Sequence, residues 1–450
     1  MNFFVYNIIV AFLFFIGGPF LFIYLFYKGL IDRHFKERLG LINSLNMPPK
    51  GNAKRVLIHA VSVGEVKVAS AIIREIKKLG GNFSIILSTT TKTGRQDALR
   101  YIPNDVIIIY NPIDMLCFVK RFLHKISPDI FINLETEIWP NFLFVSKKFN
   151  ISAFLINGRI SEKSMEIYRR FNFLIKDVLS VYTLLSMISY LDAQRITSIG
   201  ADPEKVVVGG NAKYDILVDD ARPELSKKMS GIYKIDGTKN VFIAGSTTGI
   251  EDEIIIETYG NLLRDDPDML LVIAPRHTER SRRIESILMS YKFDYCLRSK
   301  FDYHFSGNKQ VIIVDVIGEL FGLYSLGNII FCGGSLVPHG GHNILEAAVW
   351  GKTVIYGPSM ENFLDARRLI ENTGAGLEVK DGDELLKTAR WVLENPEKSD
   401  RLGKRAREEI KRNIGSAKKQ VKRIAPFLYK EGTENDMRVL LNRQYFKVET

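Results

Sequence analysis

Short runs of β-branched and other apolar residues alternate with helix-like stretches along nearly the whole chain. In the first half, six runs are expected to form strands: 56–60, 83–88, 106–110, 130–133, 153–156 and 206–208. Six more follow in the second half: 241–244, 270–274, 311–314, 329–332, 353–356 and 376–379. Strands separated by helices run parallel, with helices on both faces of the sheet. The sequence therefore predicts an α/β protein, and no other pattern in it narrows the fold as far.

Polar, glycine- and proline-containing sequence interrupts the alternation at 219–239, and 450 residues exceed one ordinary core. We therefore expect two doubly wound, Rossmann-like domains facing a cleft, with ligands bound beyond the carboxyl ends of the strands. The expected segments are a membrane anchor helix (1–30), a first domain (31–220), a linker (221–240), a second domain (241–410), and a basic C-terminal helix and tail (411–450).

The N-terminus departs from this globular pattern. Residues 3–27 carry no charge and are long enough to cross a bilayer as a helix. A cleaved signal peptide would have a basic residue before the apolar run and a small-x-small site after it, and neither is present. The basic residues that follow, beginning with Lys28 and Arg33, instead predict an uncleaved anchor with the rest of the chain in the cytoplasm. An interfacial helix broken at residues 17–19 is the alternative.

The chain is basic, with a net charge of +11, and ten Lys or Arg but only two Glu lie between Arg401 and Arg423. Such a segment suits nucleic acid, an anionic membrane surface or bulk solvent. No nucleic-acid-binding motif is present, so we expect no nucleic acid partner. The predicted anchor favours contact with membrane phospholipid, and a solvated helix face is the alternative.

A glycine-rich loop in the second half, from Gly333 to Pro358, reads GGSLVPHGGHNILEAAVWGKTVIYGP. Glycines let a backbone approach a ligand closely. A helix starting at Asn343 or Ile344 would present free N–H groups and a positive dipole end to an anion or a nucleotide sugar. Glu346, one turn into that helix, could accept both hydroxyls of a ribose. A glycine-rich crossover followed by a capped helix is the plainer interpretation.

Two other strand ends in the second half carry polar residues. Arg276 and His277 lie where the run at 270–274 ends, and a guanidinium beside an imidazole suits phosphate oxygens. The tripeptide Ile-Gly-Glu at 317–319 follows the run at 311–314 and could offer backbone groups to a base edge. Surface cations and a helix-capping glutamate are the ordinary alternatives.

Charged residues also follow strands in the first half. Glu65 comes after the first expected strand, and Glu135 and Glu137 come after the fourth, beside Trp139, which suggests a shaped pocket. Lys213 follows the last strand of this half. Carboxylates at a helix start are common because they complement the helix dipole, and a lysine at such a place is ordinarily a surface residue.

Together these segments resemble the 3-deoxy-D-manno-octulosonic acid (Kdo) transferases. Eight motifs carry the resemblance, in this order: HAVSVGE, STTTKTG, NLETEIWPN, NGRIS, GNAKYD, AGSTTGIEDE, APRHTER and GGSLVPHGGHNILE. The resemblance extends from the N-terminal apolar segment to about residue 425. It implies the two-Rossmann-domain glycosyltransferase architecture called GT-B. It also implies transfer of Kdo from CMP-Kdo to lipid IVA, the lipid A precursor, at the cytoplasmic face of the inner membrane in lipopolysaccharide synthesis.

The resemblance also assigns roles to residues. Glu65 is implied to be the general base, and Glu135 and Lys213 are implied to stabilise the transition state. The implied CMP site comprises Arg276, His277, Ile317, Gly318, Glu319, Asn343, Ile344, Leu345 and Glu346. Three motifs depart from the usual family form: NGRIS replaces an NARLS-type motif, HNILE lacks a proline, and Thr248 replaces a frequent histidine.

An inverting transferase needs one base beside the attacking hydroxyl. At Glu65, the helix start lowers the pKa whereas burial raises it, and the sequence leaves open which effect prevails. CMP leaves with a single phosphate, which Arg276, His277 and the helix end at Asn343 could stabilise. No DxD-like pair lies near these motifs, so we expect no metal and no cofactor. The alternatives are another GT-B enzyme (a UDP-sugar transferase or an epimerase) and a non-catalytic membrane-bound binding protein.

Overall fold

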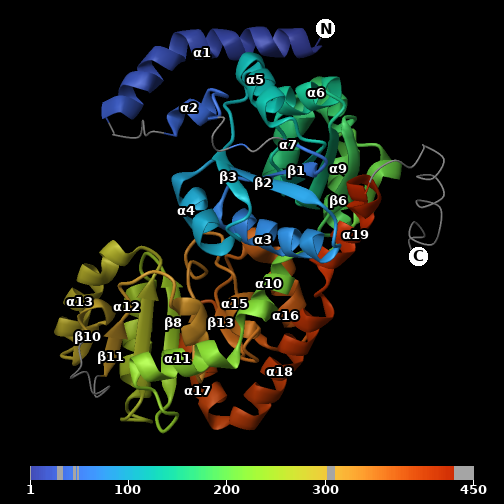
Figure 1. Ribbon diagram of the computed structural model, residues 1–450. Helices are drawn as coiled ribbons and strands as arrows, with labels where there is room; N and C mark the ends of the chain where they lie inside the picture. Colours follow the sequence, from blue (N-terminus) through green and yellow to red (C-terminus); the bar gives the residue numbers. More distant parts are fainter. Residues whose placement is uncertain (1, 28–33, 44–46, 48–49, 302–309, 430–450) are drawn as a thin grey trace. The chain divides into compact units, whose positions relative to one another are not determined.

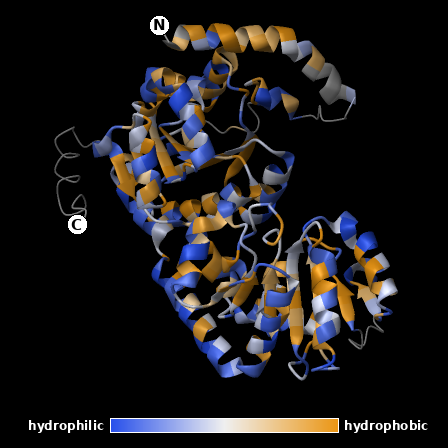
Figure 2. Cartoon of the chain, turned by 180° about the vertical axis from the view of Figure 1, so that it is seen from behind, coloured by the Kyte–Doolittle hydropathy of each residue, from blue (hydrophilic) through white to orange (hydrophobic). Residues whose placement is uncertain are grey.

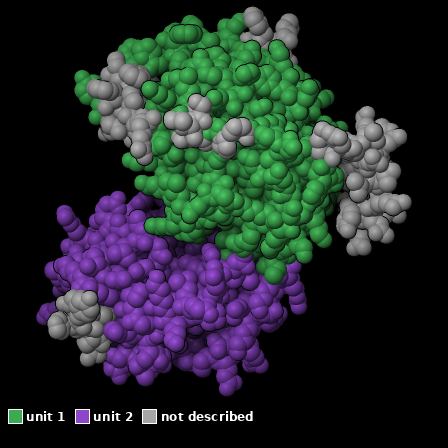
Figure 3. Space-filling model, viewed as in Figure 1, with its two compact units in different colours: residues 1–216, 414–450 green, residues 217–413 purple. Residues whose placement is uncertain are grey.

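The computed structural model describes residues 2–27, 34–43, 47, 50–301 and 310–429 (Figure 1). Contacts divide the chain into two compact units, which are coloured separately in Figure 3. Unit 1 comprises Met1–Ile216 and Ile414–Thr450, and unit 2 comprises Leu217–Asn413. The chain therefore leaves unit 1 once and returns to it near its C-terminus.

Unit 1 is built on a seven-stranded parallel sheet in the order β3-β2-β1-β4-β5-β6-β7. Its strands are β1 (Lys54–Ala60), β2 (Phe83–Thr89), β3 (Ile107–Tyr110), β4 (Ile130–Leu134), β5 (Ser152–Gly158), β6 (Tyr182–Met187) and β7 (Val206–Val208). Alternate residues of a strand point to opposite faces of the sheet. In β1, Leu57 packs into one apolar cluster, whereas Val56 and Ile58 pack into another. Both faces of this sheet are therefore buried.

Helices cover the two faces of the unit 1 sheet. One face packs against α3 (Val63–Lys78), α4 (Lys92–Tyr101) and α19 (Ser416–Tyr429). The other packs against α5 (Leu116–Ile126), α6 (Pro140–Lys148), α8 (Asn172–Leu179) and α9 (Tyr190–Ser198). The shorter α2 (Phe35–Arg38) and α7 (Glu162–Arg170) also belong to this unit, and α10 (Lys213–Asp220) crosses its boundary.

Unit 2 repeats the plan with a seven-stranded parallel sheet in the order β10-β11-β9-β8-β12-β13-β14. Its strands are β8 (Val241–Thr247), β9 (Leu270–Pro275), β10 (Tyr295–Leu297), β11 (Val311–Ile313), β12 (Ile329–Cys332), β13 (Val354–Tyr356) and β14 (Gly376–Glu378). Its helices are α11 (Pro223–Tyr233), α12 (Glu251–Leu262), α13 (Ser281–Ser290), α14 (Leu320–Leu323), α15 (Leu345–Ala348), α16 (Leu364–Glu371), α17 (Gly382–Glu394) and α18 (Pro396–Arg412). Strands are mostly apolar and helices mixed in Figure 2. The predicted α/β class with two parallel sheets is confirmed.

The segments outside the two sheets differ in detail from the sequence expectations. Residues 221–240, expected as a linker, contain helix α11, which belongs to unit 2. The expected basic C-terminal segment contains α19, which buries an apolar stripe that includes Val421 and Ile424 against the sheet of unit 1. The tail at 430–450 lies outside the described residues.

The N-terminal apolar segment forms helix α1 (Asn2–Tyr27), which lies against unit 1. Phe3 stacks on Phe144 of α6 with ring centroids 3.7 Å apart. Three turns further along, Phe14 meets Phe118 of α5 edge-on at 5.7 Å. Since a helix rises about 1.5 Å per residue, α1 follows the surface of the unit for about 17 Å.

A membrane-spanning role for α1 was expected from the sequence. Within the described ranges, no helix has both the length and the apolar character needed to cross a bilayer. The contacts of α1 with α5 and α6 also hold it along a folded unit. The predicted spanning anchor is therefore not supported. The flanking basic residues at 28–33 lie outside the described part of the chain.

Candidate functional site

Glu65 lies in the first turn of α3, directly after the interior strand β1. Ser62, the N-cap of this helix, accepts the Glu65 N–H at 3.4 Å and donates its hydroxyl to Glu65 Oε1 at 2.8 Å. Glu65 Oε2 accepts the Val61 N–H at 2.8 Å. This exchange is a variant of the capping box in which the glutamate binds the N–H before the N-cap, and it holds the carboxylate at the carboxyl edge of the sheet. Glu65 therefore does cap its helix, but each of its carboxylate oxygens accepts only one hydrogen bond and can accept another.

Burial decides the protonation of Glu65, which is only 6% exposed. Desolvation raises the pKa of Glu65 to about 7, and the negative charges of Glu135 and Glu137 also raise it. The hydrogen bonds from Val61 and Ser62 pull the pKa in the opposite direction without prevailing. A carboxylate with this pKa is suited to accept a proton near neutral pH.

Glu135 and Lys213 form an ion pair near Glu65. Lys213 Nζ lies 2.6 Å from Glu135 Oε1, and the two side chains are 37% and 17% exposed. Glu135 has a φ of 56°, a left-handed conformation that costs energy in a non-glycine residue and is frequent at functional sites. Glu137 is part of the same acidic group, because burial and then the charge of Glu135 raise its pKa. The structure thus brings together Glu65, Glu135 and Lys213.

The loop that carries Lys213 is braced by distant parts of the chain. The N–H of Ala212 donates to Asn157 Oδ1 at 2.8 Å, and the N–H of Asn157 donates to Gln420 Oε1 at 2.7 Å. The amide of Gln420 also donates to the carbonyl of Gly210 at 2.9 Å. Gln420 is fully buried in α19, so the C-terminal helix helps to fix the position of Lys213.

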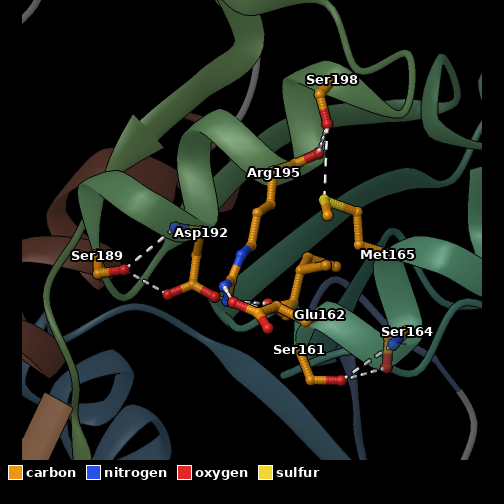
Figure 4. A network of polar contacts seen from close by, with 9 residues as sticks. Ser161, Glu162, Ser164, Met165, Ser189, Asp192, Arg195 and Ser198 are labelled. Carbon is orange, nitrogen blue, oxygen red and sulfur yellow. Dashed lines mark hydrogen bonds and ion pairs between the residues drawn. The ribbon is translucent and has the colours of Figure 1, made fainter. Parts of the chain in front are cut away.

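The NGRIS motif, which departs from the usual family form, continues from Asn157 into a polar network with α9 (Figure 4). The N–H of Ile160 donates to Asp192 Oδ1 at 2.7 Å. Arg195 donates to the carbonyl of Ile160 at 2.9 Å and pairs with Glu162 at 2.7 Å. These contacts fasten the loop after β5 to its neighbouring helix, so this motif has a structural role.

In unit 2, four basic side chains gather at the ends of β9 and β12. The pKa of His342 is lowered to about 4, first by burial and then by the positive charges of Arg276, His339 and His277. The rings of His339 and His342 have centroids 6.0 Å apart. Nε2 of His342 is buried and finds no hydrogen-bond partner among the described residues. An arginine and three imidazoles, one of them with an unpaired buried nitrogen, offer hydrogen-bond donors that suit an anionic ligand.

The other residues predicted to bind CMP have different environments. Ile317 is 91% exposed, and Gly318 has a φ of 96°. The carboxylate of Glu319 is already engaged, since it accepts two bonds of 2.9 Å from Arg298 and one of 2.6 Å from Tyr233. Within residues 317–319, only the exposed side chain of Ile317 and the backbone are therefore available to contact a nucleotide base.

The helix expected at Asn343 or Ile344 begins at Leu345 and is only four residues long. Asn343, the residue before the N-cap, accepts the N–H of Leu345 through Oδ1 at 3.3 Å. Ile344 and Leu345 are buried, and Glu346 is half-buried. This short helix has too few aligned peptides for a substantial dipole, so the permanent positive charge of this site comes from Arg276.

The sequence interpretation assigned no role to His339 and His342, although both lie in the glycine-rich loop. Their signal was the string PHGGH, in which two imidazoles flank two glycines with φ values of 88° and 76°. For the part of the chain that the structure describes, no group of three His, Cys, Asp or Glu side chains is arranged to hold a metal ion.

Comparison with known proteins points to one family. Residues 33–216 match the family model described as 3-Deoxy-D-manno-octulosonic-acid transferase (kdotransferase). A 3-deoxy-D-manno-octulosonic acid transferase from Haemophilus influenzae is 32% identical over 393 residues, which cover 87% of this chain and 91% of that protein.

Two solved structures share the fold. A glycosyltransferase from Rickettsia africae has a TM-score of 0.58 at 16% identity and covers 84% of this chain and 100% of its own. A UDP-GlcNAc 2-epimerase from Neisseria meningitidis has a TM-score of 0.58 at 15% identity and covers 81% of this chain and 100% of its own. At such identities the two structures indicate a common architecture and nothing about substrates.

Proposed function

The chain belongs to the 3-deoxy-D-manno-octulosonic acid transferase family, and we propose that it transfers Kdo from CMP-Kdo to lipid IVA in lipopolysaccharide synthesis. The observation that carries the proposal is the buried Glu65 carboxyl, whose pKa of about 7 fits it to accept a proton at neutral pH. Its position beside the Glu135–Lys213 ion pair supports a reaction in which charge develops close to the base.

The proposed reaction is a single inverting displacement. Glu65 takes the proton of an acceptor hydroxyl as that oxygen bonds to the anomeric carbon of Kdo. The bond from this carbon to the phosphate oxygen breaks, and CMP leaves with the electron pair. Lys213, held by Glu135, supplies positive charge near the Kdo carboxylate or the developing charge.

We assign the donor to unit 2. Arg276 and His277 hold the CMP phosphate, and His342 adds its free Nε2. Residues 317–319 face the base through Ile317 and the backbone. Asn343, Ile344 and Leu345 contribute backbone groups, and Glu346 contributes its carboxylate to the ribose. No metal or cofactor is part of the proposal.

We also propose that α1 rests on the surface of the inner membrane, with the two units on the cytoplasmic side. Ile8, Phe12 and Phe15 leave 52%, 63% and 73% of their surface exposed, although α1 packs on unit 1 through Phe3 and Phe14. Such an apolar face suits the boundary between lipid headgroups and acyl chains. Deleting residues 1–27 should lower activity on acceptor in phospholipid vesicles more than on acceptor in detergent, and equal losses would contradict surface docking.

The proposed function is tested with purified full-length protein, CMP-Kdo and lipid IVA. Mass spectrometry should detect Kdo-modified lipid, and Glu65→Ala should lower turnover by about 100-fold or more while the protein stays folded. Turnover above about a tenth of wild type in that variant would rule out Glu65 as the base. Heat protection by UDP but not CMP would favour a UDP-sugar enzyme, and CMP binding without product would favour a binding protein.

A further inference from the structure

The acidic first turn of α12 contacts both loops that carry the basic residues of the proposed donor site, Arg276 and His277 on one and His342 on the other. This turn contains Glu251, Asp252 and Glu253, within the motif AGSTTGIEDE, and it follows the central strand β8. Glu251 and Asp252 are both completely buried. A buried carboxylate needs partners that replace its hydration, so its contacts indicate what it does.

Glu251 has an unusually complete set of backbone donors. Its Oε2 accepts the N–H groups of Thr248 at 2.8 Å and Gly334 at 2.7 Å. Its Oε1 accepts the N–H groups of Ser335 and Leu336, both at 2.9 Å. Since a carboxylate has about four lone-pair sites, these four bonds saturate it.

The bonds to Glu251 change the interpretation of the glycine-rich loop. The N–H groups of residues 334–336 are not available to a ligand anion, because this internal carboxylate already accepts them. The same turn supports the histidines, because the N–H of Gly341 donates to the carbonyl of Gly334 at 2.8 Å. A Cβ on Gly334 would lie 2.9 Å from the ring of His342, so this ring packs directly on the fixed turn.

Asp252 holds the loop that carries Arg276 and His277. Its carboxylate pairs with Arg280, which also donates to the carbonyl of Gly249 at 2.7 Å. The N–H of Arg280 in turn donates to the carbonyl of His277 at 3.0 Å. Through Arg280, Asp252 fixes the short segment that presents Arg276 and His277.

We propose that Glu251 and Asp252 are positioning residues of the donor site, which fasten the loops at 333–342 and 276–280 so that Arg276, His277 and His342 face one anion. Neither carboxylate contacts the donor. The identity of that anion as CMP rests on the proposed function, whereas the fastening of the two loops does not.

The test replaces Glu251 by glutamine. The carboxamide keeps one oxygen but puts an NH₂ group opposite two N–H donors, so two of the four hydrogen bonds are lost. We expect the KM for CMP-Kdo and the Kd for CMP to rise by about 10- to 100-fold, the loss seen when groups that orient ligating side chains are removed. The KM for lipid IVA should stay within about twofold, because Glu251 lies in unit 2, to which the donor is assigned.

Hydrogen exchange gives a readout that does not depend on the ligand. The amides of residues 334–336 should exchange faster in Glu251→Gln than in wild type. Glu253→Gln is the matched control from the same turn, because its ion pair with Arg283 is solvent-exposed and contributes little. It should leave CMP affinity and exchange unchanged.

Wild-type CMP affinity in a folded Glu251→Gln variant, or an equal rise of both KM values, would overturn the positioning role. If Glu251→Gln does not fold, Asp252→Asn decides the matter, since it should weaken CMP binding and speed exchange at residues 276–280. Wild-type behaviour in Asp252→Asn would then refute the proposal. Failure of the wild-type protein to bind CMP would instead refute the proposed function. The hydrogen-exchange rates would still test whether Glu251 and Asp252 fix the two loops.

Discussion

Replacing Glu65 by glutamine should stabilise the folded protein at neutral pH while it abolishes transfer. Glutamine has nearly the same shape as glutamate and can keep the local contacts. Its carbonyl can accept the Val61 N–H, and its amide can donate to the Ser62 hydroxyl. The variant therefore differs from wild type mainly in having no charge to bury.

The size of the stabilisation follows from the pKa. Burial raises the pKa of Glu65 from 4.5 to about 7, so an ionised Glu65 costs the folded state about 3 kcal/mol relative to the unfolded chain. Below pH 4.5 the carboxyl is protonated in both states, and the cost is absent. Between pH 4.5 and 7 the unfolded chain releases the proton first, so wild-type stability falls as pH rises. The advantage of glutamine should therefore appear across this window and stay constant above it.

The assay is urea unfolding of both proteins at pH 4.5 and pH 8, together with activity at pH 8. We expect Glu65→Gln to unfold at higher urea at pH 8, by up to about 3 kcal/mol, and to match wild type at pH 4.5. Glu166→Gln, at an exposed position of α7, is the control and should change neither value. Equal stability at pH 8, or the same gain at both pH values, would refute the assignment of a buried, costly charge to Glu65.

Three further predictions test other contacts. Lys213→Met should lower kcat and move the acid limb of the pH–rate profile to higher pH, because the unpaired charge of Glu135 would raise the pKa of the base further. Tyr6→Phe removes a 3.1 Å bond to the buried Asp114 and should lower the free energy of unfolding by about 1 kcal/mol in urea. His342→Gln should raise the KM for CMP-Kdo about tenfold with little effect on the KM for lipid IVA, measured by steady-state kinetics.

The local part of the fold was predictable because the period of apolar residues is a local signal. The unforeseen strands are those in which this signal is weak. In β6 the sequence YTLLSM continues into further apolar residues, so length and period do not separate strand from helix. The edge strand β10 has only three residues and no buried ones. Neither omission affects the sheet edges that carry the candidate site.

The long-range part of the site could not be predicted from the sequence. The bond from Gly334 to Glu251 joins residues 83 positions apart, and the bond from Asn157 to Gln420 joins residues 263 positions apart. The sequence indicated that a glycine-rich loop was present but not that a carboxylate already occupied its N–H groups. The direction of the pKa shift at Glu65 likewise depends on burial, which only the packed structure defines.

Glu65 and Glu251 occupy corresponding places in the two units, and the number of donors around each accounts for the different roles proposed for them. Each lies in the first turn of the helix that follows the first strand of its unit, β1 or β8. Glu251 accepts four backbone N–H groups, which engage its carboxylate completely and suit it to bracing the loop. Glu65 accepts one backbone N–H and one hydroxyl, and the remaining lone pairs of its poorly solvated carboxylate can take a proton. The same position in a Rossmann-like unit thus leaves a carboxylate available for the proposed proton transfer where donors are few, and provides a structural contact where they are complete.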